Sequence, residues 1–75
     1  MPERIAKKLS GDAKRFLAWY YCGEEGGLII AGEALERAIA ESARRRLVRL
    51  DDDGVVCGET ELGRQVAAAL AKEGT

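Results

Sequence analysis

Histidine is absent from this chain of 75 residues, and proline, cysteine and aromatic residues are scarce. Without histidine, Cys22 and Cys57 supply too few ligands for a zinc site. We therefore expect two reduced, partly buried thiols, with a disulfide or redox role as the alternative. No run approaches the roughly 20 apolar residues of a membrane span, and the start Met-Pro-Glu-Arg is not typical of a signal peptide. These absences predict a cytoplasmic protein without metal, cofactor or membrane.

Catalytic groups are also sparse in the sequence. Histidine, the commonest general acid or base of enzymes, is missing. The three adjacent aspartates at 51–53 point in different directions, so they make no positioned acid and base pair, and their spacing is not that of a calcium-binding loop. Neither cysteine has an evident base partner that would activate it. We expect that the protein is not an enzyme.

Charged residues make up 33% of the chain and nearly balance, with a net charge of −1. They are segregated along the sequence, however. Residues 1–15 carry five basic and two acidic side chains, and residues 37–50 carry five arginines and one glutamate. Residues 51–61 carry five acids and no base. Proteins whose whole surface binds nucleic acid are usually basic overall, so the sequence allows only a local basic face.

The length is that of one small domain, which we place at 10–75, after a basic arm or short helix at 1–9. Ser10 is a typical N-cap residue and predicts a helix from there to about Cys22. Trp19 lies off the apolar face of this helix. We interpret it as packed under the N-terminal arm, with a partner contact as the alternative. The apolar face has the i, i+3, i+4 and i+7 spacing of a core stripe, formed by Ala13, Phe16, Leu17 and Tyr20.

The region from residue 33 to residue 50 contains neither glycine nor proline, so one long helix is its simplest interpretation. That helix would place Glu36 among the apolar residues of its inner face. A break near Ser42 leaves Glu36 in solvent and makes Ser42 an N-cap. We therefore favour two helices, at 33–39 and 42–51, over one continuous helix.

Short β segments and a last helix are expected around these helices. Residues 28–30 are an apolar run between turn residues and predict a buried strand. Gly54 fits the left-handed position that ends a helix, and 55–57 is interpreted as a strand that turns at Gly58 and returns. Thr60 then caps a helix whose inner stripe is formed by Leu62, Val66, Ala69 and Leu70.

The run RRLVRLDDDGVV, followed by TELGRQVAAAL, resembles the C-terminal part of winged helix-turn-helix domains of bacterial and phage regulators. The resemblance covers about residues 12–73 and rests on packing residues. It implies that Leu47 and Leu50 belong to the core and that Val55 and Val56 begin the wing. The fold it implies is α+β and mostly α: a three-helix core, a small β-hairpin wing that a third short strand could join, and a closing C-terminal helix.

The resemblance also implies binding of double-stranded DNA as a small transcriptional regulator, with residues 42–51 as the recognition helix. Ser42, Arg45 and Arg49 would face the major groove, because arginine can bind guanine O6 and N7 through two hydrogen bonds. Phosphates would be held by Arg44, Arg46, Lys14 and Arg15. The alternatives are a winged-helix module that binds protein and a small homodimer that does not bind DNA.

The C-terminal helix is the expected dimer contact, if there is one. Its small side chains would allow a twin helix to approach closely, although alanines are also strong helix formers by themselves. The residues concerned are Ala67, Ala68 and Ala71.

Overall fold

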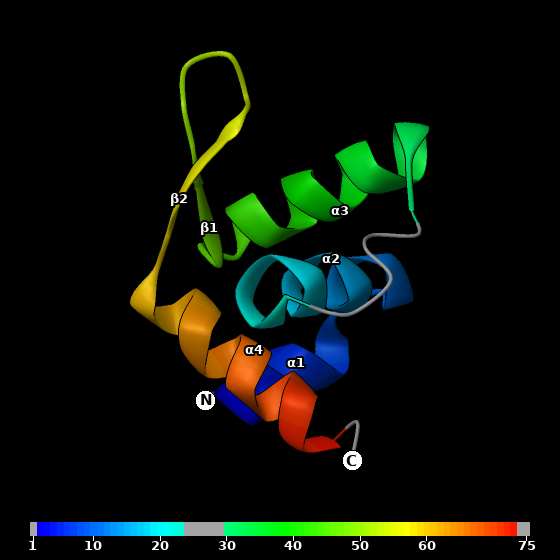
Figure 1. The fold of residues 1–75 in the computed structure, drawn as a ribbon, viewed down its shortest axis with the longest axis vertical. Helices are drawn as coiled ribbons and strands as arrows, with labels where there is room; N and C mark the ends of the chain where they lie inside the picture. Colours follow the sequence, from blue (N-terminus) through cyan, green and yellow to red (C-terminus); the bar gives the residue numbers. More distant parts are fainter. Residues whose placement is uncertain (1, 24–29, 74–75) are drawn as a thin grey trace.

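A computed structural model describes residues 2–23 and 30–73, which form four helices and one two-stranded antiparallel sheet. The fold is α+β and mostly helical, as the sequence predicts, and the hairpin of the two strands extends from the helical part (Figure 1). The elements follow one another as α1 (Pro2–Lys8), α2 (Gly11–Cys22), α3 (Gly32–Arg44), β1 (Val48–Leu50), β2 (Val56–Glu59) and α4 (Glu61–Glu73).

The two N-terminal helices form for local reasons that the sequence already contains. Ser10 caps α2, because its Oγ accepts a hydrogen bond from the Ala13 amide at 3.2 Å. Gly23 ends α2 in the left-handed conformation, with a φ of 62°, and its N–H donates to the Trp19 carbonyl. The stretch before Ser10 contains the short helix α1, which buries Ala6, and Leu9, which follows the helix, is also buried in the core.

Residues 32–44 form one continuous helix, so the predicted break near Ser42 is wrong, and so is the predicted helix at 42–51. Ser42 is fully buried, and its Oγ donates to the Ala38 carbonyl at 2.8 Å instead of capping a new helix. The break was predicted because one helix that ran on to Leu47 and Leu50 would have placed Glu36 on its buried face. The observed helix ends at Arg44, before those two leucines, and Glu36 is exposed.

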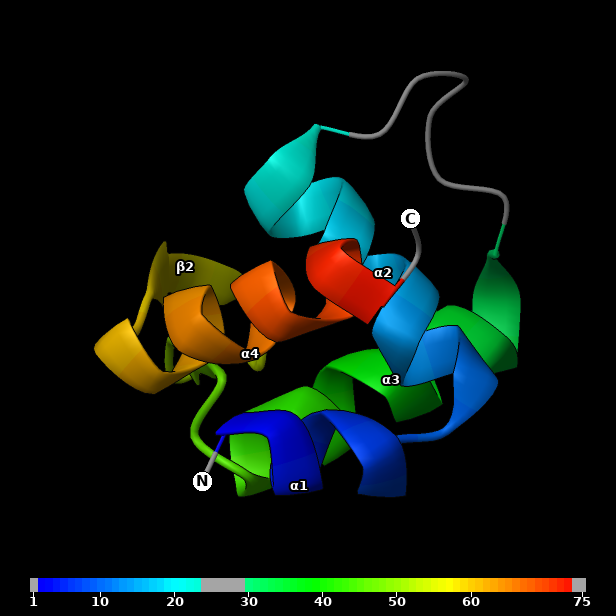
Figure 2. The same cartoon turned by 90° about the horizontal axis from the view of Figure 1, so that it is seen from below.

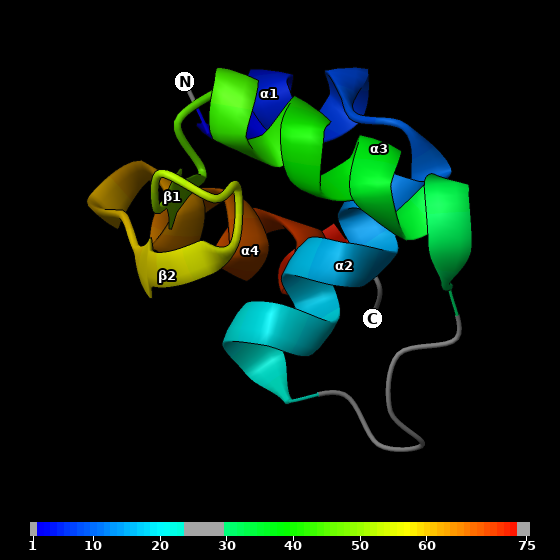
Figure 3. The same ribbon diagram turned by 90° about the horizontal axis from the view of Figure 1, so that it is seen from above.

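The chain after α3 forms a strand where a helix was expected. Arg46 adopts the left-handed conformation, with a φ of 62°, which is uncommon for residues other than glycine and ends the helical path. β1 then pairs antiparallel with β2, with Val48 opposite Glu59 and Leu50 opposite Val56. Figure 3 shows this hairpin beside the C-terminal end of α3.

The hairpin turns after Asp51 and not at Gly58, which lies within β2. The Asp51 carboxylate accepts hydrogen bonds from the amides of Asp53 and Val55, each at 2.9 Å. Gly54 has a φ of 81°. The left-handed glycine that the sequence predicts is therefore present, but in a hairpin turn and not at a helix end.

Thr60 caps α4, as predicted, and also fastens the base of the hairpin. Its Oγ1 accepts a hydrogen bond from the Gly63 amide at 2.9 Å and donates one to the Arg46 carbonyl at 2.7 Å. The Tyr21 hydroxyl donates to the Leu47 carbonyl and accepts from the Thr60 amide at 3.1 Å. One tyrosine of α2 thus joins the start of the hairpin to the start of α4.

The core lies where α2, α4 and the base of the hairpin meet. α2 packs against both α3 and α4, and α1 packs against α4 (Figure 2). Leu17, Leu47 and Val66 are completely buried. The predicted stripes of α2 and α4 are confirmed, since their remaining members are buried or pack against this core. Of the third strand expected at 28–30, the first two residues lie outside the described residues, and Ile30 is not in a strand.

Candidate functional site

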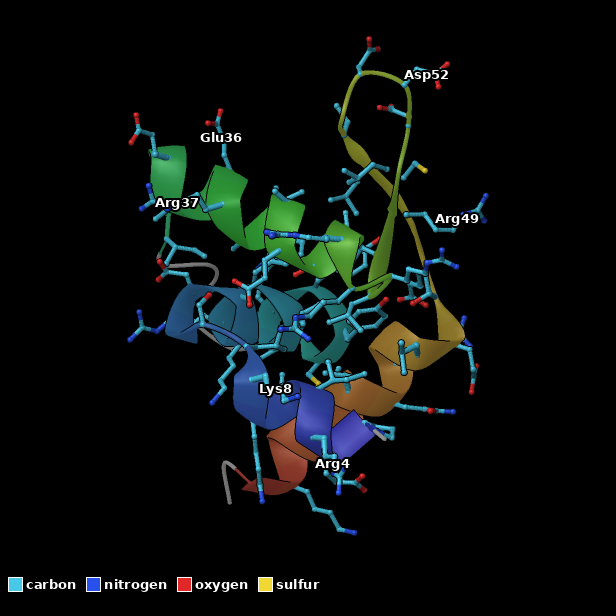
Figure 4. The ribbon with its side chains drawn as sticks, turned by 180° about the vertical axis from the view of Figure 1, so that it is seen from behind. Arg4, Lys8, Glu36, Arg37, Arg49 and Asp52 are labelled. Carbon is cyan, nitrogen blue, oxygen red and sulfur yellow. The ribbon has the colours of Figure 1, made fainter. Side chains whose placement is uncertain are left out.

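Four arginines form a basic surface where α3 meets the hairpin. Arg44 is the last residue of α3, Arg45 and Arg46 follow it, and Arg49 is the middle residue of β1. Arg45 is half-buried and the other three are exposed. Arg49 projects away from the hairpin (Figure 4), because neighbouring strand residues point to opposite faces and Val48 occupies the buried one. We call the four residues the arginine surface.

The arginine surface differs from several other arginines of the described residues in its ion pairing. Three other arginines each lie close to a carboxylate. The pairs are Arg15 with Asp12 at 3.6 Å, Arg37 with Glu33 at 3.8 Å, and Arg64 with Glu59 at 3.1 Å. Among the side chains that the structure describes, no carboxylate lies within ion-pair distance of the arginine surface. Its positive charge is therefore available to a ligand.

Glu41 explains why part of this charge stays unpaired. Residues one turn apart on a helix are neighbours, so Glu41 would normally pair with Arg44 or Arg45. Its carboxylate instead accepts hydrogen bonds from the Ser10 amide at 3.0 Å and the Ser10 hydroxyl at 2.8 Å. These bonds hold the end of α3 to the start of α2. An open hollow of about 460 Å³ is lined by Glu41 and the two arginines.

The predicted DNA contacts fall in different places. The four arginines of the arginine surface follow one another closely in the chain, but they come from a helix end, a turn and a strand and not from one helix face. Ser42 is completely buried, so its predicted contact with DNA is wrong. Lys14 and Arg15 lie on α2, and no hydrogen bond or ion pair among the described residues connects them to the arginine surface.

Negative charge gathers at the tip of the hairpin. The aspartates at 51–53 are all exposed, and Asp52 projects from the tip (Figure 4). Glu36 projects from α3 at the same end of the molecule, whereas Arg4 and Lys8 lie at the opposite end on α1 (Figure 4). Acidic side chains thus gather at the hairpin tip, and Arg37 lies beside Glu36 on α3 (Figure 4).

An apolar hollow of about 400 Å³ opens between α2, α3 and the hairpin, with a lining that includes Trp19, Leu35, Ile39 and Val55. Trp19 is 37% exposed and Val55 is 59% exposed. Trp19 therefore lies at this hollow and not under the N-terminal arm, where the sequence placed it. Tyr20 also lines the hollow. Burial raises the pKa of its phenol, and the nearby charge of Glu59 raises that pKa further.

The sequence interpretation missed this hollow because it placed the hairpin turn too late. Asp53 and Gly54 lie between two apolar runs, which is a strong short-range signal for a hairpin. That signal was assigned to a helix end. With the turn at its observed place, Val55 comes beside α3 at the rim of the hollow.

Both cysteines, Cys22 and Cys57, are free thiols and both are exposed, whereas partial burial was expected. The strand register shifts between Arg49 and Leu50, so Cys57 has no residue opposite it and forms a β-bulge. Within the described part of the chain, no group of three or more histidine, cysteine, aspartate and glutamate residues is arranged to hold a metal ion.

None of the helices in residues 2–23 and 30–73 is long and apolar enough to cross a membrane. Comparisons with protein-family models, with curated proteins and with solved structures found no match for this chain. The assignment of a function therefore rests on the arginine surface and the apolar hollow.

Proposed function

We propose that this protein binds double-stranded DNA through the arginine surface and acts as a small transcriptional regulator of the winged-helix type. The observation that carries the proposal is that, among the side chains that the structure describes, no carboxylate forms an ion pair with these four arginines, three of which are exposed. Guanidinium groups bind phosphate oxygens through paired hydrogen bonds. Phosphate contacts of this kind supply most of the affinity of proteins for DNA at low salt.

The order of elements supports the winged-helix part of the proposal. α3 leads directly into the hairpin, and the hairpin leads into α4. In this arrangement α3, and not residues 42–51, is the helix that would enter the major groove. Arg37 and Arg44 lie two turns apart on its exposed side. Arg45, Arg46 and Arg49 would then hold the phosphates next to that groove.

The acidic hairpin tip limits how DNA can lie. The carboxylates at 51–53 would be repelled by phosphates, so the tip would point away from the duplex. Arg49 lies nearer the base of the hairpin and would meet the backbone there. Lys14 and Arg15 stay candidate phosphate contacts. We expect moderate affinity that depends mainly on charge.

A homodimer through α4 stays a prediction. Ala67 is only 2% exposed and packs inside its own chain, so Ala68 and Ala71 are the alanines that could meet a second copy. Dimers of winged-helix and helix-turn-helix type bind two half-sites. A dimer would therefore pair two arginine surfaces on one duplex.

The test is a fluorescence anisotropy titration of a labelled duplex of mixed sequence at several salt concentrations. We expect micromolar affinity at about 50 mM salt, and a slope of about −3 for log K against log salt, because Arg45, Arg46 and Arg49 would neutralise about three phosphates. Replacing Arg45 and Arg49 together by alanine should weaken binding and make the slope shallower by about two.

The matched control is Arg4→Ala with Arg64→Ala, which removes the same charge from α1 and α4. It should keep most of the affinity. Absence of binding at about 50 μM protein in low salt, where even non-specific binders associate, would reject the proposal. Equal affinity of the two double variants would also reject the arginine surface as the site.

A further inference from the structure

We infer that the apolar hollow between α2, α3 and the hairpin is a docking site for a short amphipathic segment of a partner protein, in which one or two large apolar side chains are flanked by lysine or arginine. This surface is separate from the arginine surface, and the inference does not depend on DNA binding.

The hairpin presents Val55 to solvent in a fixed position. Its amide donates to the Asp51 carboxylate at 2.9 Å, and its carbonyl accepts from the Asp51 amide at 2.9 Å. Gly54 supplies the left-handed turn beside it. An exposed valine held on both sides of its backbone is already positioned for contact, so a partner would not have to order it.

Aromatic residues of α2 form the opposite side of the hollow. Phe16 and Tyr20 stack with their ring centroids 5.8 Å apart, and Tyr20 meets Tyr21 edge to face at 5.1 Å. Phe16 is buried and anchors this group in the core. Trp19 stands beside it, partly exposed. Tryptophan and tyrosine in such positions are the residues that most often dominate protein interfaces.

The charge around the hollow selects a basic partner. Glu36 lines an adjoining hollow of about 360 Å³ that shares Ile39 and Gly54 with the larger one. The aspartates at 51–53 stand on the hairpin tip next to Val55, and Figure 4 shows Glu36 and Asp52 at the same end of the molecule. Among the described side chains, none of these acids has an ion-pair partner. A nucleic acid would be repelled here, and lysine or arginine attracted.

The size of the hollow sets the length of the occupant. A volume of about 400 Å³ accepts a few side chains and not a whole domain. A second folded copy would need to bury roughly 800 Å² on each partner for a stable dimer. An amphipathic helix that inserts apolar side chains at positions i, i+3 or i+4 into a groove buries a much smaller surface area. We therefore commit to a short segment.

The experiment is a selection of random peptides displayed on phage against the immobilised full chain. The expected result is a set of enriched peptides with large apolar residues between lysines or arginines. Synthetic copies should shift the fluorescence of Trp19, the only tryptophan of the chain, as it becomes covered. Val55→Lys should weaken their binding by about tenfold or more, since each lost contact of about 1.4 kcal/mol changes the affinity tenfold.

Two sets of variants make the selection decisive. Gln65→Lys adds the same charge at an exposed site on α4 and should change the affinity less than about twofold. Glu36→Lys with Asp52→Lys should weaken the basic peptides several-fold at low salt. Val55→Ser tests the apolar contact without adding charge, and circular dichroism checks that each variant is folded.

Several outcomes would overturn the inference. No enriched peptide, enriched peptides that are acidic or uncharged, or binding that survives both Val55 variants would each do so. A dimer in sedimentation equilibrium that Val55→Lys dissolves would place a second copy in the hollow instead. Competition between the peptides and duplex DNA for one surface would also contradict a separate site.

Discussion

At the scale of single residues, Tyr21 and Gly63 show how closely α2, α4 and the hairpin are packed. The Tyr21 hydroxyl connects the Leu47 carbonyl to the Thr60 amide. A Cβ atom on Gly63 would overlap both the Leu47 carbonyl oxygen and that hydroxyl. The Thr-Glu-Leu-Gly run that opens α4 therefore has two functions. Thr60 caps the helix, and Gly63 lets the helix lie close to Leu47 and Tyr21, where a larger residue would not fit.

This packing predicts an unusual response to Gly63→Ala. Alanine usually stabilises a helix interior relative to glycine by up to about 1 kcal/mol. Here the added methyl group meets backbone and a bonded hydroxyl, so the free energy of unfolding should fall by about 1–3 kcal/mol, as for other overpacked sites. Urea unfolding followed by circular dichroism measures it. Gly11→Ala, where a Cβ meets nothing within 4 Å, should not destabilise the protein and serves as the matched control.

At the scale of elements, the boundary between α3 and the hairpin decides what the arginines do. α3 stops at Arg44, and Arg46 turns the chain into β1. The arginines consequently spread over a helix end, a turn and a strand. The same boundary releases the aspartates to form the tip, where Asp51 accepts two backbone hydrogen bonds.

The tip should depend on Asp51 much more than on its neighbours. Asp51→Ala removes the acceptor of the Asp53 and Val55 amides, which should cost about 1 kcal/mol, because water can replace part of each bond at an exposed site. Hydrogen exchange at the Val55 amide should accelerate about fivefold, measured by NMR. Asp52→Ala removes the same charge with no such bond and should leave this exchange rate unchanged. Equal effects of the two variants would contradict the turn geometry.

At the scale of the whole molecule, the arginine surface and the apolar hollow lie on different parts of one small chain with a radius of gyration of 11.3 Å. The arginine surface begins at the C-terminal end of α3. The hollow is bounded by earlier residues of α3, such as Leu35, and by the hairpin near its tip. The net charge of −1 averages over these two regions and describes neither.

This separation predicts that the two binding activities can be removed independently. Val55→Lys should weaken peptide binding by about tenfold or more but leave DNA affinity equal or slightly higher, because it adds a positive charge. Arg45→Ala with Arg49→Ala should weaken DNA binding and leave peptide affinity unchanged. The same anisotropy and fluorescence titrations measure both. Loss of DNA binding in Val55→Lys would show instead that DNA covers the hollow.

Local features were predicted well because their causes lie within a few residues. Ser10 and Thr60 cap helices through bonds to the amides three positions later. Gly23 ends α2 in the conformation that glycine alone adopts easily. The apolar spacing of α2 fits the helical period and nothing else. The sequence by itself therefore determined the α+β class, the helices α2 and α4, and the Thr60 cap of α4.

Only the tertiary structure decided the path of residues 42–50. Ile39, Ala43, Leu47 and Leu50 have helical spacing, and no glycine marks the turn that Arg46 makes. A helical extension and a strand differ little in local preference. The strand prevails because β2 supplies its backbone partners, while Tyr21 and Thr60 bind the carbonyls of Leu47 and Arg46. Those partners come from distant parts of the chain, so local spacing could not reveal them.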